Sequence, residues 1–285
     1  MVEHRDYNVV FDGSWNGFLC VVYAYYYDGV NPLIIQTEED CQAMLETEAF
    51  YVATDDAKAA RALGGIKKRI CDDAAGKLYG AYLSGEDEKY MDMFRYVLLG
   101  FKKGAAVVDN LQEACVKRVH KLAGYVGRES HLLSGFCRFA ETRQGVYYCA
   151  ISPTNHVLGN LAEHFKDRFL NHAWVIHDRR HGLAAVYDGY EYVIAEVPKD
   201  AKIQYAEAEE EFQDLWQAFY DTIAIKERAT YKRKRQVLPL KYRGMMLEQV
   251  PRFKKSGEVA AANGRVYLSV QNEVIAANAA IPLIP

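Results

Sequence analysis

The sequence lacks the features that would mark an exported, membrane-spanning or strongly basic protein. The amino terminus is charged and has no apolar stretch of the kind that a secretory signal carries. No run of about 18 apolar residues occurs, so we expect no membrane-spanning segment. The formal net charge is −3, which excludes a protein that binds nucleic acid by its overall charge. Any nucleic-acid surface must therefore be local.

The sequence also lacks the short motifs of several common chemistries. Its six cysteines form no CxxC pair, so they predict reduced, mostly buried thiols in a cytoplasmic protein and no metal site. A CxxxCxxC run is absent, so the chain does not carry a radical-SAM cluster itself. The phosphate-binding motifs GxxxxGK[ST] and GxGxxG and the serine-hydrolase motif GxSxG are absent as well. We therefore expect no bound cofactor.

The first half of the chain has mainly helical patterns. Residues 7–11 predict a strand, and Ser14 is placed to cap the helix that follows it. Residues 55–82 predict helix with an interruption at Gly64–Gly65, and an apolar stripe over 90–101 predicts a buried helix that ends at Gly104. Residues 37–40 have the cap and the acidic first turn of a further helix.

From residue 136 the hydrophobic period changes to two, which is typical of strands. Strands are predicted at 136–141, 146–151, 174–178, 183–187 and 190–197, with a helix at 158–169. Asp188–Gly189 indicates a tight hairpin, and the short connections favour an antiparallel sheet. A second helix is predicted from the apolar stripe of Phe212, Leu215, Trp216, Phe219 and Ile223.

These patterns predict an α+β fold with a helical amino-terminal layer packed on a mostly antiparallel sheet. We expect residues 1–135 to form a strand-plus-helical region and residues 136–230 the sheet with its helices, packed together into one unit. Residues 231–285 form a basic segment and tail.

The helix predicted from Leu111 onward is unusual. Lys117, Lys121 and Arg128 share one of its faces, and Gly124 and Gly127 lie on another. Each glycine costs about 1 kcal/mol relative to alanine inside a helix. Two explanations stay open: a backbone or ligand approaches the glycines closely, or the helix ends at Gly127.

A basic segment follows at 226–243, where eight basic residues and one acidic residue give a local charge of +7. Tyrosines are interleaved with the cations, as in surfaces that bind phosphates and stack bases. A solvated tail or a contact with a partner protein would have the same composition. The residues that we expect to bind nucleic acid are Lys117, Lys121, Arg128, Arg138, Arg228, Tyr231, Lys232, Arg233 and Arg235.

Six collinear segments carry a resemblance to a known family: residues 11–19, 119–131, 135–139, 164–168, 174–178 and 222–228. They resemble a bacterial family associated with DNA metabolism and repair, whose own reaction is unassigned. The resemblance implies a radical-SAM protein encoded nearby and similar domains fused to uracil-DNA-glycosylase-like domains. It implies functional roles for His120, Arg128, Glu129, His131, Arg138, His164, Arg168, Asp178, Glu227 and Arg228.

Three hypotheses follow. The first is an accessory protein that binds nucleic acid, in particular DNA, and works with a radical-SAM or glycosylase-like partner. The second is a nucleic-acid-processing enzyme that uses His131 and neighbouring charges, with Asp178 as the second catalytic candidate. The third is a protein-interaction subunit with a basic tail. Convergence of His131, Arg138, His164 and Asp178 in one pocket would favour the enzyme.

Overall fold

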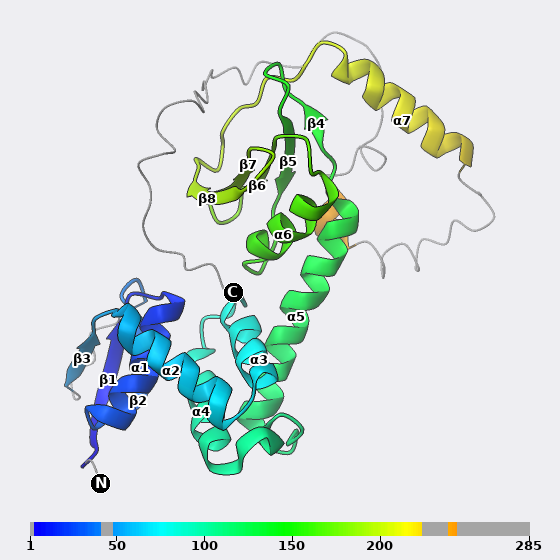
Figure 1. The fold of residues 1–285 in the computed structure, drawn as a ribbon. Coiled ribbons are helices and arrows are strands. Elements are labelled where there is room, and N and C mark those ends of the chain that lie inside the picture. The colour runs from blue at the N-terminus through cyan, green and yellow to red at the C-terminus, as the bar shows by residue number, and fades with distance from the viewer. Residues whose placement is uncertain (1–2, 41–47, 224–238, 244–285) are drawn as a thin grey trace. The chain divides into compact units, whose positions relative to one another are not determined.

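The computed structural model describes residues 3–40, 48–223 and 239–243, and the chain divides into two compact units, Met1–Arg128 and Glu129–Pro285. Helix α5 (Ala114–Phe136) contains residues of both units. The predicted α+β class is confirmed, with helices and mixed sheets in the same chain (Figure 1). None of the described helices combines the length and apolarity needed to cross a membrane.

The first unit is built on a parallel sheet that the sequence did not predict. Its strands are β1 (Arg5–Phe11), β2 (Val30–Thr37) and β3 (Ala49–Val52), in the order β2-β1-β3. Around it lie α1 (Trp15–Tyr27), α2 (Asp56–Arg69), α3 (Asp72–Tyr82), α4 (Tyr90–Lys103) and the 3-10 helix η1 (Gly104–Val107). Buried side chains of both layers form one hydrophobic core, which is the main source of stability for such a unit.

Local signals explain most helix ends in this unit. The Ser14 hydroxyl accepts a hydrogen bond from the amide of Gly17 at 2.9 Å and so begins α1 as predicted. Helix α4 ends at Gly104, whose φ of 65° favours glycine. The interruption predicted at Gly64–Gly65 is wrong, because α2 continues to Arg69 and buries Ile66 completely. The helix predicted from residues 37–40 would continue into residues outside the described ranges.

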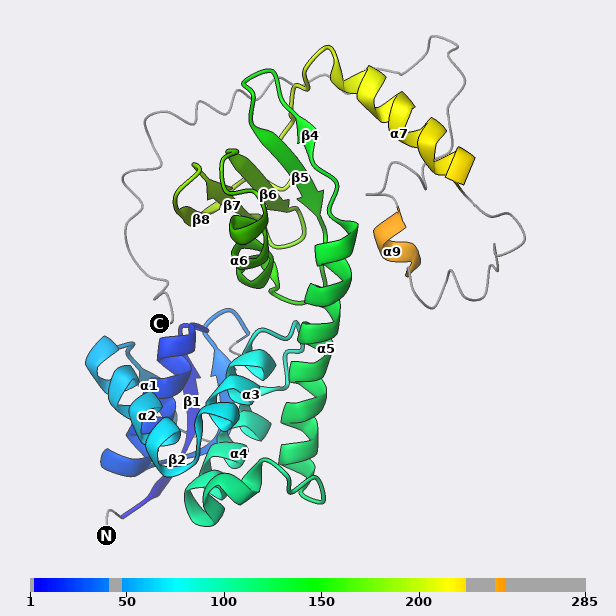
Figure 2. The same ribbon diagram turned by 45° about the vertical axis from the view of Figure 1, so that its right-hand side comes forward.

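The second unit contains a five-stranded sheet in the order β4-β5-β6-β7-β8. Its strands are β4 (Ala140–Glu141), β5 (Tyr147–Ile151), β6 (Trp174–Asp178), β7 (Leu183–Tyr187) and β8 (Tyr192–Glu196). All neighbours are antiparallel except β5 and β6, which are parallel. Helix α6 (Leu158–Arg168) connects these two and lies across one face of the sheet (Figure 2). The mostly antiparallel sheet is therefore confirmed.

Two further helices follow the sheet. Helix α7 (Glu209–Ile223) begins with three glutamates, which suit the positive end of a helix dipole. The short helix α9 (Leu240–Arg243) lies beside the end of α5 (Figure 2). Its Tyr242 is only 2% exposed, so a residue near the end of the described chain completes the core of the second unit.

Candidate functional site

A cavity of about 570 Å³ opens in the second unit at the carboxyl ends of α5 and α6. It lies where the chain leaves α5, passes through residues 137–139 and enters the sheet. The lining residues are His131, Leu132, Ser134, Gly135, Phe136, Cys137, Arg138, Phe139, His164, Phe165, Arg168 and Phe169. Convergence in one pocket was expected of four residues if the protein is an enzyme. Three of them line this cavity: His131, Arg138 and His164.

The floor of the cavity is aromatic. The ring of Phe139 lies 5.0 Å from the ring of Phe165 and 5.1 Å from that of Phe169, in edge and tilted contacts. Phe165 is 4% exposed and belongs to the buried face of α6. His164 and Arg168 are four residues apart on the same helix, so they lie on one face, and both are exposed at the rim.

Arg138 is held at the rim by the end of α5. Its guanidinium donates hydrogen bonds to the carbonyls of Gly135 (3.0 Å) and Cys137 (3.1 Å) and lies 5.8 Å from the centre of the Trp216 ring. The prediction that Arg138 lies on a strand is wrong, because α5 extends to Phe136 and β4 begins only at Ala140. The alternative that the helix ends at Gly127 is wrong for the same reason.

Apart from Arg138, the residues predicted to bind nucleic acid fall into three groups. Lys117 and Lys121 are exposed on the part of α5 that belongs to the first unit, and Lys121 lies 5.6 Å from the ring centre of Tyr125. Arg128 is the last residue of that unit and is absent from the cavity lining. The remaining predicted residues lie outside the described residues: Arg228, Tyr231, Lys232, Arg233 and Arg235.

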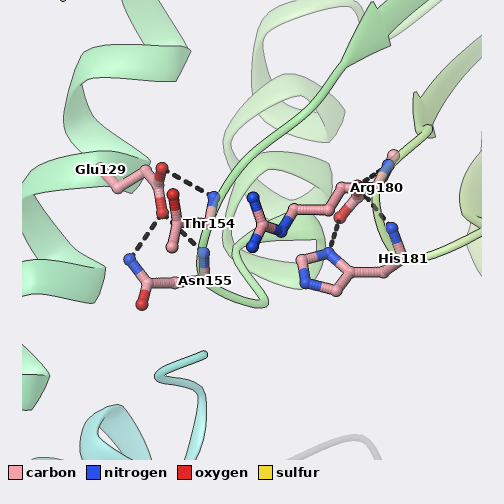
Figure 3. Close-up of polar contacts among 6 residues, drawn as sticks. Glu129, Thr154, Asn155, Arg180 and His181 are labelled. Atoms are coloured by element: carbon pink, nitrogen blue, oxygen red, sulfur yellow. Dashed lines mark hydrogen bonds and ion pairs between the residues drawn. The ribbon is translucent and has the colours of Figure 1, made fainter. Parts of the chain in front are cut away.

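Asp178 does not join His131 in the cavity. It is the last residue of β6, is 1% exposed, and accepts hydrogen bonds from the amides of Arg180 (3.0 Å) and His181 (3.2 Å). Its other carboxylate oxygen lies 2.6 Å from Nδ1 of His181 (Figure 3). The charged hairpin turn predicted after Asp178 is therefore present, and the Asp178 carboxylate holds it together.

His177 and Asp178 contact different groups, as strand alternation predicts. Nδ1 of His177 lies 2.8 Å from the hydroxyl of Tyr148, and the histidine is 1% exposed. Burial and the nearby Arg179 lower the pKa of His177 below its usual value. The imidazole of His177 is neutral and buried, so we interpret it as a packing residue.

Glu129 is a buried carboxylate with many hydrogen-bond partners, which the sequence did not identify. Its buried carboxylate accepts hydrogen bonds from the amide of Thr154 (2.9 Å), the amide of Asn155 (2.7 Å) and the side-chain amide of Asn155 (2.6 Å), as Figure 3 shows. Lys241 donates to it at 2.8 Å, and the Tyr242 hydroxyl donates as well. These partners are distant in the sequence, so no local pattern could have identified them.

The hydrogen bonds decide the ionisation of Glu129. Burial alone would raise its pKa, but the bonds from Lys241, Thr154, Tyr242 and Asn155 together lower it to about 2. Burial and the adjacent carboxylate raise the pKa of Tyr242 above its usual value, so its hydroxyl stays protonated and donates. The group is a fully satisfied anchor that fixes the loop after β5 and helix α9 to α5.

The cavity combines an apolar floor with a rim of two arginines and two histidines. Flat aromatic side chains stack against nucleobases, and one guanidinium group can donate two parallel hydrogen bonds to the oxygens of a phosphate. The volume falls in the range of sites that take small organic ligands, about 300 to 1,000 Å³. Among the described residues, no group of three or more His, Cys, Asp or Glu side chains is placed to share a metal ion.

Comparisons with known proteins give one family match. A family model described as DUF4130, a domain of unknown function, matches residues 87–248. No curated protein matches the sequence. The solved structure of a pGpG-specific phosphodiesterase from Vibrio cholerae is similar at 9% identity, over 76% of this chain and 100% of that one, with a TM-score of 0.32. A TM-score this low does not establish a common fold.

Proposed function

This chain belongs to the DUF4130 family, and we propose that its second unit binds nucleic acid by taking an unpaired nucleotide into the cavity at the ends of α5 and α6. The observation that carries the proposal is the pairing of a phenylalanine floor with a cationic rim. A base would stack on Phe139 and Phe169, while Arg138 and Arg168 would contact the flanking phosphates.

The charge distribution supports an anionic ligand at this place. The whole chain carries a formal charge of −3, so its overall charge does not attract a polyanion. The rim nevertheless gathers two permanent cations and two imidazoles around one opening. Such a site favours a single strand, because the base of a duplex would first have to leave its stack, at a cost of a few kcal/mol.

The nucleic acid that we propose is DNA, and the role is that of an accessory protein which presents the strand to a partner enzyme. Both parts rest on the resemblance described for the sequence, which implies a radical-SAM partner. If this role is right, co-purification with that protein should become stronger when single-stranded DNA is added. Failure to associate at tens of micromolar, with or without DNA, would contradict the accessory role.

Binding can be tested by fluorescence anisotropy with a labelled, mixed-sequence 20-nucleotide DNA strand and the matching duplex as competitor. Replacing the exposed Arg168 by Gln removes one phosphate contact, so the slope of log K against log salt should become shallower by about 0.7. Lys166→Gln is the matched control: it removes the same charge from α6, but Lys166 lies near the ring of Tyr192 and outside the cavity lining.

Base stacking on the aromatic floor of the cavity can be tested independently of the phosphate contacts. Phe169→Leu keeps an apolar side chain but removes the ring, so it should weaken single-strand binding by about 1 to 3 kcal/mol and leave the salt slope unchanged. Unchanged binding in both Arg168→Gln and Phe169→Leu would remove the cavity from the interface. No binding of any strand at 50 mM salt would refute the proposed function itself.

A further inference from the structure

The carboxyl ends of β5 and β6 bring two loops together at one edge of the second unit. The strands are parallel, and their last residues, Ile151 and Asp178, are paired in the register. The loop after β5 carries Thr154, Asn155 and His156, and the turn after β6 carries Arg180 and His181. In sheets with parallel strands, ligand sites commonly lie outside the carboxyl ends, where such loops meet.

The turn contains a carboxylate and an imidazole in direct contact. One oxygen of Asp178, Oδ2, lies 2.6 Å from Nδ1 of His181, while the other, Oδ1, accepts both backbone amides of the turn. The Asp178 side chain is 1% exposed and that of His181 is 15% exposed. A buried carboxylate therefore orients a ring that still reaches solvent.

This geometry determines which ring nitrogen of His181 is basic. A carboxylate oxygen accepts, so Nδ1 carries the hydrogen and Nε2 keeps its lone pair. No residue in the described ranges hydrogen-bonds Nε2 of His181. The same carboxylate would stabilise the imidazolium that forms when Nε2 takes a proton, which is the role of the aspartate in a catalytic Asp-His pair.

The surroundings of His181 favour an anionic substrate. The ring of His156 lies 4.1 Å from that of His181, in a tilted contact. Figure 3 shows the Arg180 side chain extending from the same turn toward the loop of Thr154 and Asn155. Arg180 is exposed, and within the described part of the chain no side chain pairs with its guanidinium. An unpaired guanidinium beside a general base is suited to a phosphate group.

We propose that Asp178 and His181 form an acid–base pair that hydrolyses phosphodiesters. Nε2 of His181 takes a proton from water, and the water oxygen forms a bond to phosphorus while Arg180 binds a non-bridging oxygen. The bond from phosphorus to the leaving oxygen breaks, and that oxygen takes a proton from the solvent as His181 returns its own to the solvent. One water is consumed, and an alcohol and a phosphomonoester are formed. Asp178 is the positioning residue.

The pair and the cavity are separate sites. His156 lies just before α6, whereas His164 and Arg168 lie toward its end, and the 11 residues of this helix span about 16 Å. The proposal therefore does not rest on nucleotide binding in the cavity. A small diester tests it alone, because such a molecule needs no cavity contacts.

The decisive variant is Asp178→Asn. The amide oxygen of asparagine can still accept the two backbone amides of the turn, but its NH2 group would face Nδ1 of His181 and donate to it. The ring would then carry its hydrogen on Nε2 and lose the lone pair that accepts the proton. The turn is kept, and only the tautomer changes.

The assay uses bis(p-nitrophenyl) phosphate and a labelled single-stranded DNA, each with EDTA and with Mg²⁺. The intact chain should hydrolyse the diester, and both His181→Gln and Asp178→Asn should lose at least about 100-fold in kcat/KM. The matched control is His172→Gln, which removes an exposed histidine from the loop before β6 and should leave the rate unchanged.

A spectroscopic signature separates positioning from mere stability. Nitrogen-15 NMR of the histidines should find His181 with its hydrogen on Nδ1 in the intact chain and on Nε2 in Asp178→Asn, with both proteins folded. No hydrolysis of either substrate under any of these conditions would overturn the proposal. So would full activity in His181→Gln, or an Nε2–H tautomer in the intact chain.

Discussion

Replacing Glu129 by glutamine should destabilise the second unit by about 3 kcal/mol at neutral pH. Five donors converge on the carboxylate: two amides, the Asn155 side chain, Lys241 and Tyr242. Glutamine offers one acceptor oxygen and turns an NH2 group toward the remaining donors. Lowering the pKa from 4.5 to about 2 corresponds to about 3 kcal/mol, because a ten-fold change in proton affinity is worth about 1.4 kcal/mol.

The pH dependence has a definite sign. The pKa of Glu129 is lower in the folded protein than in the unfolded chain, so the unfolded chain binds more protons between pH 4.5 and about 2. The stabilisation is complete above pH 4.5 and is lost as the pH falls toward 2. The difference between the intact chain and Glu129→Gln should therefore shrink over that interval.

The measurement is urea unfolding followed by the tryptophan fluorescence of the second unit, where Trp174 is fully buried and Trp216 is partly exposed. Trp15→Phe in both proteins removes the tryptophan of the first unit from the signal. Tyr242→Phe completes a double-mutant cycle with Glu129→Gln and should show a coupling of at least about 1 kcal/mol. A Glu129→Gln protein within 0.5 kcal/mol of the parent at pH 7, or a difference that grows on acidification, would refute the reasoning.

Three glycine substitutions test the packing of the first unit. Gly124→Ala and Gly127→Ala should each raise the free energy of unfolding by about 0.5 to 1 kcal/mol, because both lie inside α5 and a methyl group would meet nothing within 4 Å; a lower melting temperature would contradict this. Gly100→Ala should cost about 1 to 3 kcal/mol, because its methyl group would overlap the buried Ile70; a neutral result in urea unfolding would show that Ile70 moves aside.

The strands of the second sheet could be predicted because their signals are local. Residues 174–178 and 183–187 form β6 and β7 as predicted, since each is a short apolar run bounded by turn residues. The parallel sheet of the first unit was missed because Pro32 breaks the strand pattern of β2, and because β3 has only four residues.

The site was harder to predict because it depends on where one helix stops. Helix α5 continues through Gly124 and Gly127 and ends at Phe136, so Arg138 lies in a loop at the cavity. The partners of Glu129 lie 25 to 113 residues away, beyond any periodic signal. The helix over 209–223 was predicted, but its apolar residues are 40 to 66% exposed, since a stripe does not specify what covers it.

The contact between Tyr242 and Glu129 joins residues that are 113 positions apart. During translation, Glu129 emerges from the ribosome long before the residues that complete its hydrogen bonds, and closing a loop of this length costs about 4 kcal/mol in chain entropy. A nascent chain that stops short of Lys241 would leave the carboxylate with three donors instead of five. The second unit therefore stays incomplete, and open to quality-control proteases, until nearly all of the described chain has been made. All core residues of the first unit have been synthesised much earlier.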